Sequence, residues 1–145
     1  MLFRSVVKIT NSSALGSASG TTTVASNATL EVSGGITSAE PITISGDGVT
    51  VSAAEVGAIL NSSGTNTLSG AITLAAASEV QIDTGTTLTM SGGFTGDSFA
   101  LTVDGVGTST ISGAIATSTG SLTKLGTGTL TLSAANTYKI GRAHV

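Results

Sequence analysis

Aliphatic residues recur two positions apart along most of the chain, usually with Thr, Ser, Glu or Gln between them. The pairs are Leu30/Val32, Ile42/Ile44, Val49/Val51, Ile72/Leu74, Val80/Ile82, Leu88/Met90, Leu101/Val103 and Leu130/Leu132. A period of two places one set of side chains on a buried face and the other on an exposed face. The pattern therefore predicts short strands, each with aliphatic side chains inside and hydroxyl groups outside.

Turn signals lie between these strands. They are "SGG" at Ser33 and Ser91, "GDG" at Gly46, "DTG" at Asp83, "DGVG" at Asp104 and "LGTG" at Leu125. Glycine adopts positive φ easily, and an aspartate side chain caps its own turn. Strands of about five residues with a turn every 8 to 12 residues or so are typical of a sandwich, a barrel or a solenoid.

Internal repetition favours the solenoid. "ATLEVSGGI" at residues 28–36 recurs 58 positions later as "TTLTMSGGF", and "LSGAI" at 68–72 recurs 43 positions later as "ISGAI". Both offsets are near small multiples of about 20 residues, the length of one solenoid coil. Aromatic residues make up only 3% of the chain, and a narrow coil can be filled by Val, Ile, Leu and Ala. We therefore predict an all-β solenoid.

Two segments, residues 52–60 ("SAAEVGAIL") and 74–80 ("LAAASEV"), could suggest helices. Ser52 and Glu55 match a capping box. However, the first segment is only about two turns long and contains Gly57, and isolated helices of that length are marginal. We predict that both segments are bends or short insertions between coils.

Composition narrows the range of functions. The chain has 145 residues, which suits one domain, a net charge of −3, 9% charged residues and no cysteine. Binding to nucleic acid needs clustered Lys and Arg, and no such cluster occurs here. Nucleic acid is therefore excluded as a partner.

The candidates for catalysis are few. His144 is the only histidine, and it lies in a tail without a pattern. Eight carboxylates are spread along the chain: Glu31, Glu40, Asp47, Glu55, Glu79, Asp83, Asp97 and Asp104. Separated carboxylates are usually solvated turn or face residues, so we predict no catalytic residue, cofactor or metal site and hence no enzyme. An acid–base pair that cleaves polysaccharide, as in some β-helix enzymes, is the alternative. "GDG" and "DGVG" hint at calcium ligands, but the nonapeptide of calcium-binding β-rolls is absent.

Threonine and the aromatic residues raise two further possibilities. "TTT", "TLT" and "TGTLTL" would suit an ice-binding face, which needs Thr at regular spacing. The irregular repeat offsets argue against such a face. Phe94, Phe99 and Tyr138 are expected to be packing or coil-edge residues rather than stacking platforms for sugar.

Residues 120–138, "GSLTKLGTGTLTLSAANTY", carry a family resemblance. The segment resembles the passenger-associated transport repeat, also called the autotransporter-associated β-strand repeat. Ala134 departs from the glycine that is usual in the family. The matching residues are Leu122, Thr123, Lys124, Gly126, Gly128, Thr129, Leu130, Leu132, Ser133, Ala135, Asn136, Thr137 and Tyr138.

This resemblance implies a right-handed parallel β-helix fragment from the passenger of an autotransporter, exported by type V secretion. The expected location is the bacterial cell surface or the secreted fraction, reached through the outer membrane. The expected partner is the parent protein's own C-terminal outer-membrane barrel, with host-surface or self-association contacts if the parent is an adhesin. The implied role is a structural stalk that supports outward folding and display. The alternative is a fragment of a β-helix carbohydrate-active enzyme.

The sequences at the two ends of the chain differ from the sequence between them. "MLFRS" at residues 1–5 and "KIGRAHV" at residues 139–145 can both be back-translated as parts of one short-read sequencing adapter, in opposite orientations. We therefore expect residues 1–5 and 139–145 to be non-native and adapter-derived. Residues 6–138 would then be the β-solenoid passenger fragment, with the recognisable repeat at 120–138.

Overall fold

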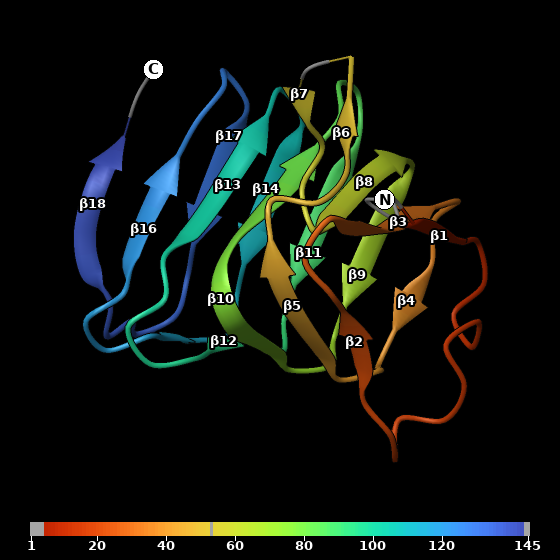
Figure 1. Ribbon diagram of the computed structural model, residues 1–145, viewed down its shortest axis with the longest axis horizontal. Coiled ribbons are helices and arrows are strands. Elements are labelled where there is room, and N and C mark those ends of the chain that lie inside the picture. Colours follow the sequence, from red (N-terminus) through yellow and green to blue (C-terminus); the bar gives the residue numbers. More distant parts are fainter. Residues whose placement is uncertain (1–4, 53, 144–145) are drawn as a thin grey trace.

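A computed structural model describes residues 5–52 and 54–143, and the side chains up to residue 139 apart from residue 53. The described residues form strands and turns, with no helix. Parallel strands stack as a β-solenoid of about six turns, with β1 and β18 toward opposite ends of the stack (Figure 1). The predicted all-β solenoid is confirmed.

Each coil passes through three stacks of strands, which we call faces A, B and C. Face A contains β1 (Ser5–Ile9), β3 (Ala28–Ser33), β8 (Ile59–Ser63), the second half of β10 (Ile72–Ile82), β13 (Leu101–Gly105), β16 (Ser121–Lys124) and β18 (Lys139–Ala143). Face B contains β4 (Thr37–Ser38), β9 (Thr65–Leu68), β11 (Thr87–Met90), β14 (Thr108–Ile111) and β17 (Thr129–Leu132). Face C contains β2 (Thr22–Val24), β5 (Ile42–Gly46), the first half of β10, β12 (Phe94–Thr95) and β15 (Ile115–Ala116).

The strand register gives the coil length directly. Thr65, Thr87, Thr108 and Thr129 pair in succession on face B, which makes the coils 22, 21 and 21 residues long. One coil is longer, since Ile42 pairs with Ile72. That coil contains an antiparallel hairpin of β6 (Thr50–Val51) and β7 (Ala54–Glu55). The predicted coil of about 20 residues is confirmed, with this one insertion.

Only one of the two sequence repeats reflects stacking. "LSGAI" and "ISGAI" lie two coils apart, because Leu68 and Ile111 both pair with Met90. The 58-residue repeat does not: Leu30 lies on face A, whereas Leu88 lies on face B. An aliphatic–polar–aliphatic strand followed by a glycine turn fits either face. The interpretation of the 58-residue offset as a multiple of the coil length was therefore wrong.

Aliphatic side chains fill the coil interior as predicted. Ile59, Ile72, Leu88 and Leu101 are fully buried, and each contributes about 1.5–3 kcal/mol on burial. The pair Val49/Val51 is the exception. Val49 is buried but outside the interior cluster, and Val51 is 54% exposed. Val51 lies in the inserted hairpin and Val49 shortly precedes it, so neither residue is in a coil strand.

The segments 52–60 and 74–80 behave nearly as expected. The first contains the end of the inserted hairpin and the start of β8, so it is an insertion. The second lies inside β10, an 11-residue strand that turns from face C to face A with a register irregularity between Leu74 and Ser78. It is therefore a bend through which the strand continues.

Phe94 and Tyr138 have the packing role that we expected, whereas Phe99 is exposed. Phe94 is fully buried in the core, Phe99 is 37% exposed, and Tyr138 packs partly buried against the core. Among the described residues, no helix has the length and apolar character needed to cross a membrane.

Both ends of the described stack leave strand edges and interior positions uncovered. β1, β2 and β4 at one end, and β15, β17 and β18 at the other, each have a single strand partner. Val7 lies in register with the buried Leu30, yet it is 56% exposed. Residues 5–9 and 139–143 form paired strands, and their adapter origin stays a prediction.

Candidate functional site

Three of the eight carboxylates come within electrostatic range of a fourth, Glu79 on β10. They are Asp104 on β13, Asp47 shortly before the inserted hairpin and Glu55 within it. Asp104 pairs with Gln81, two residues after Glu79. We call these four residues the acidic cluster, and the stack creates it from positions far apart in the sequence.

The inserted segment explains the burial of Glu79, which occupies an outward position of face A. Val49 N donates to Thr29 Oγ1 at 3.0 Å, and Thr29 Oγ1 donates to the carbonyl of Gly57 at 2.8 Å. The insertion thus folds back over the outer surface of face A. Thr29 and Glu79 are consequently only 2% and 9% exposed. Strand periodicity cannot reveal such a cover, so the sequence analysis missed it.

Burial raises the pKa of Glu79 to about 7, and repulsion from Asp104, Asp47 and Glu55 acts in the same direction. A carboxyl that holds its proton near neutral pH is a property of general acids. No group of three or more His, Cys, Asp or Glu in the described part of the chain could hold a metal ion.

Two other carboxylates are tied to neighbouring coils. Glu31 accepts hydrogen bonds from Lys8 Nζ at 2.8 Å and Ser62 Oγ at 2.6 Å, and the Lys8 bond holds the pKa of Glu31 below its ordinary value. Glu40 is 6% exposed and accepts from Thr22 Oγ1 at 3.1 Å, while its Oε2 has no partner among the described residues.

The last two carboxylates lie in or beside turns. Asp83 accepts from Gln81 Nε2 at 3.4 Å, and Asp97 accepts from Ser118 Oγ at 2.9 Å. His144 lies outside the described residues.

Face B presents an array that the sequence analysis did not expect. All nine outward positions of its five strands are threonine, in two columns that run across the stack. We call this surface the threonine array. The first column is Thr37, Thr67, Thr89, Thr110 and Thr131, and the second is Thr65, Thr87, Thr108 and Thr129.

The expectation of irregular Thr spacing is wrong for this face. The ladders of face B contain no register irregularity, whereas those involving β3/β8, β5/β10 and β16/β18 do. The inserted hairpin lengthens one coil without disturbing the alignment, because Thr37 still pairs with Thr67. Irregular offsets in sequence thus coexist with regular columns in space.

A buried polar network joins faces A and B. Asn66 Oδ1 accepts from the backbone N–H groups of Gly35 (2.9 Å) and Ile36 (2.8 Å). Its Nδ2 donates to Asn61 Oδ1 and Ser63 O, each at 2.7 Å. These bonds connect two successive coils, and Asn61 Nδ2 donates to Thr86 Oγ1 of the following coil at 2.9 Å. No sequence signal pointed to this network beyond asparagine at a strand's inward position.

Three residues of the recognisable repeat, Lys124, Gly128 and Asn136, have a physical role that the structure makes clear. Lys124 takes the inward place below Val103 and donates to the carbonyls of Leu125 and Gly126. Its burial lowers its pKa. Asn136 Oδ1 accepts from Ile115 N at 2.8 Å, which ties the repeat to the coil before it.

A glycine in the same repeat allows close stacking of coils. A Cβ at Gly128 would collide with the carbonyl of Gly107 in the preceding coil. Asn136 and Gly128 of the repeat thus serve contacts between successive coils.

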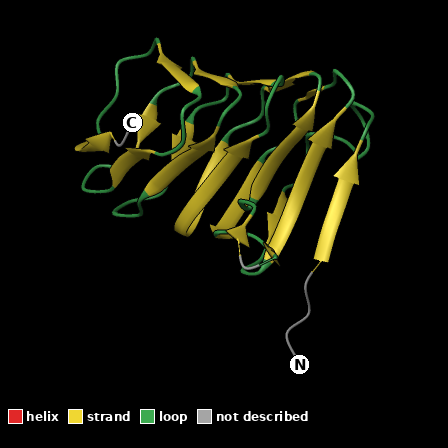
Figure 2. Cartoon of the chain, turned by 90° about the horizontal axis from the view of Figure 1, so that it is seen from above, coloured by secondary structure: helices red, strands yellow, loops and turns green. Residues whose placement is uncertain are grey.

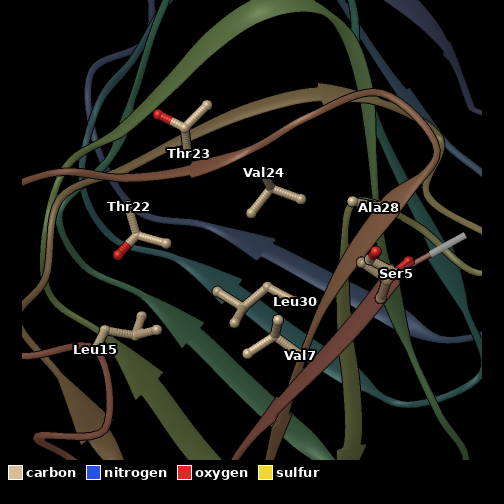
Figure 3. Close-up of a pocket in the computed structure, with 9 residues that line it drawn as sticks. Ser5, Val7, Leu15, Thr22, Thr23, Val24, Ala28 and Leu30 are labelled. Carbon is tan, nitrogen blue, oxygen red and sulfur yellow. The ribbon is translucent and has the colours of Figure 1, made fainter. Parts of the chain in front are cut away.

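An apolar hollow opens at the β1 end of the stack (Figure 3). Val7, Leu15, Val24 and Leu30 point into it. Figure 2 shows the stacked strands from above, with the N-terminal strand at one end of the stack. The hollow is continuous with the apolar interior of the solenoid. Its apolar lining is the kind of surface that one coil of a solenoid covers in the next.

The chain has no match among protein-family models, curated proteins or solved structures to which it was compared.

Proposed function

We propose that residues 6–138 are a structural stalk segment in the passenger of an autotransporter, exported by type V secretion and displayed as part of an adhesin. The observation that supports this proposal is the stack itself: about six coils, open at both ends, whose repeat residues serve contacts between coils. The handedness proposed from the family resemblance is right-handed. The bacterial cell surface is the proposed location.

The physical advantage of such a stalk lies in its stability from nearest neighbours. A coil cannot bury its own interior, and each added coil covers the one before it. Folding can therefore start at one end and proceed coil by coil as the chain emerges outside the cell. The proposed partner is the parent protein's own outer-membrane barrel, which would deliver the unfolded chain.

Surface display of the parent protein tests this proposal. We expect protease added to intact cells to cleave the passenger. Asn136→Ala should lower the amount displayed, because Ile115 N–H then loses its acceptor. Thr131→Ser, on the outward side of the same coil, is the matched control and should display normally. A parent protein that stays protected inside intact cells would contradict the proposal.

A β-helix carbohydrate-active enzyme is the second candidate, and the acidic cluster favours it. Glu79 could act as a general acid, with Asp104 on the adjacent strand as its partner. Polysaccharide turnover that disappears in the Glu79→Ala/Asp104→Ala variant but persists in Asp83→Ala/Asp97→Ala would support an enzyme. No turnover by the unchanged protein would remove this candidate.

A further inference from the structure

The threonine array of face B is regular and uncharged. Its outward side chains are exposed or half-buried, and none of the nine is charged or aromatic. Face A differs, because its outward positions include Lys8, Glu31 and Asp104. Face C has one Thr column, and its Thr73 and Thr95 hydroxyls bond to each other at 3.2 Å.

The hydroxyls of the array are free to bond water. Within the described residues, no side-chain hydroxyl of the nine threonines bonds to another protein group. Each offers one donor and two acceptor positions. The array thus combines an unused hydrogen-bonding group and an exposed methyl group at every position.

The array is also held in place before it meets any ligand. Threonine is β-branched and stiff at χ1, and the strands beneath are fixed by buried side chains such as Leu88, Met90 and Ile111. A surface already ordered in its bound conformation has little side-chain entropy to lose on binding. Its rigidity therefore favours a rigid, periodic partner.

The spacing of the array follows from strand geometry. Adjacent strands lie about 4.8 Å apart, and residues two apart on one parallel strand are separated by about 6.6 Å. Threonines such as Thr67, Thr89 and Thr110 thus repeat down a column at the strand spacing. This repeat is close to that of water oxygens along the a axis of hexagonal ice, and the second column presents the same repeat beside the first.

We propose that face B binds the surface of ice. The chemistry disfavours the other ordered partners: a nucleic acid or an ionic mineral would need charged groups on this face, and the nine threonines offer no aromatic ring on which the sugars of a crystalline polysaccharide could stack. Ice is a neutral lattice of hydrogen-bonding groups, as is the array. This function is separate from the proposed stalk, and either could fail without the other.

Ice partitioning of the purified full chain tests the proposal. We expect the protein to become enriched in a slowly grown ice hemisphere, to shape ice crystals into facets and to produce thermal hysteresis that increases with protein concentration. Thr89→Lys, at the centre of the array, should abolish faceting and partitioning. Thr73→Lys on face C is the matched control and should retain both.

The outcome decides the proposal in either direction. Exclusion of the unchanged protein from ice would overturn it, as would equal partitioning by folded Thr89→Lys and Thr73→Lys. Far-UV circular dichroism and the melting temperature establish folding. If Thr89→Lys does not fold, the milder Thr89→Val/Thr110→Val pair decides, since it keeps shape and strand propensity. It should melt normally and partition less, and unchanged partitioning by this pair would overturn the proposal. Binding to cellulose or chitin without binding to ice would also overturn it.

Discussion

Replacement of Asn66 by alanine should be among the most damaging single changes in this solenoid. The Asn66 amide accepts from Gly35 N and Ile36 N and donates to Asn61 Oδ1 and Ser63 O. Asn66 is fully buried, so water cannot replace these bonds without opening the stack. Alanine removes all four at once.

The expected cost follows from the groups left without partners. A buried donor or acceptor that loses its partner costs about 1–3 kcal/mol. The groups that lose a partner include the N–H groups of Gly35 and Ile36 and the buried Oδ1 of Asn61, whereas Asn61 Nδ2 keeps its bond to Thr86 Oγ1. We therefore expect Asn66→Ala to lower the free energy of unfolding by about 3–5 kcal/mol. This is a large part of the roughly 5–15 kcal/mol typical of a domain.

Urea unfolding followed by far-UV circular dichroism measures this cost. Asn11→Ala is the matched control, because Asn11 makes one exposed side-chain bond to Ser13 N. It should cost less than about 1 kcal/mol. If Asn66→Ala costs no more than Asn11→Ala, the buried network does not hold the coils together and the reasoning fails.

Three further predictions concern stability. Between about pH 4.5 and 7, Glu79 holds its proton more tightly in the folded protein than in the unfolded chain, so the free energy of unfolding should fall by up to about 3 kcal/mol as pH rises. Glu79→Gln should flatten this dependence of the free energy of unfolding on pH, measured by urea titrations. An unchanged dependence would show that Glu79 is not its cause. Gly48 and Gly85 both have positive φ, but only at Gly48 would a Cβ collide with the Gly57 carbonyl. Gly85→Ala should thus cost about 1 kcal/mol and Gly48→Ala about 1–3 kcal/mol more, and equal melting temperatures would contradict the packing. Phe94→Ala should cost about 3–5 kcal/mol, against about 1 kcal/mol or less for the 37% exposed Phe99, and calorimetry should separate the two.

Strand positions were predictable because alternation has only one physical explanation in this chain. Leu30/Val32 and Leu101/Val103 place aliphatic side chains inside and polar ones outside, and a one-residue slip would reverse them. The inserted hairpin was not predictable in this way. Val49 and Val51 also alternate, yet their strand pairs with β7 outside the coil.

The face to which each strand belongs was harder to predict than the strand itself. Leu30 and Leu88 lie in similar local sequences but on different faces of the solenoid, because the local pattern carries no information on coil register. The threonine array was hidden for the same reason, as was the convergence of Asp47 and Asp104 near Glu79. Such groupings depend on the number of residues in each coil. The pairing of Thr37 with Thr67 shows that an insertion can change this number without changing which residues stack.

The most direct test of the stalk proposal is the sequence of the gene that encodes this segment, read continuously across it in one long molecule. We expect a secretory signal upstream, more coils on either side of residues 6–138, and an outer-membrane barrel domain downstream. The codons now assigned to residues 1–5 and 139–145 should be replaced by passenger sequence. A gene without signal or barrel, in which this segment adjoins a hydrolase domain and keeps both ends as they stand, would contradict the account.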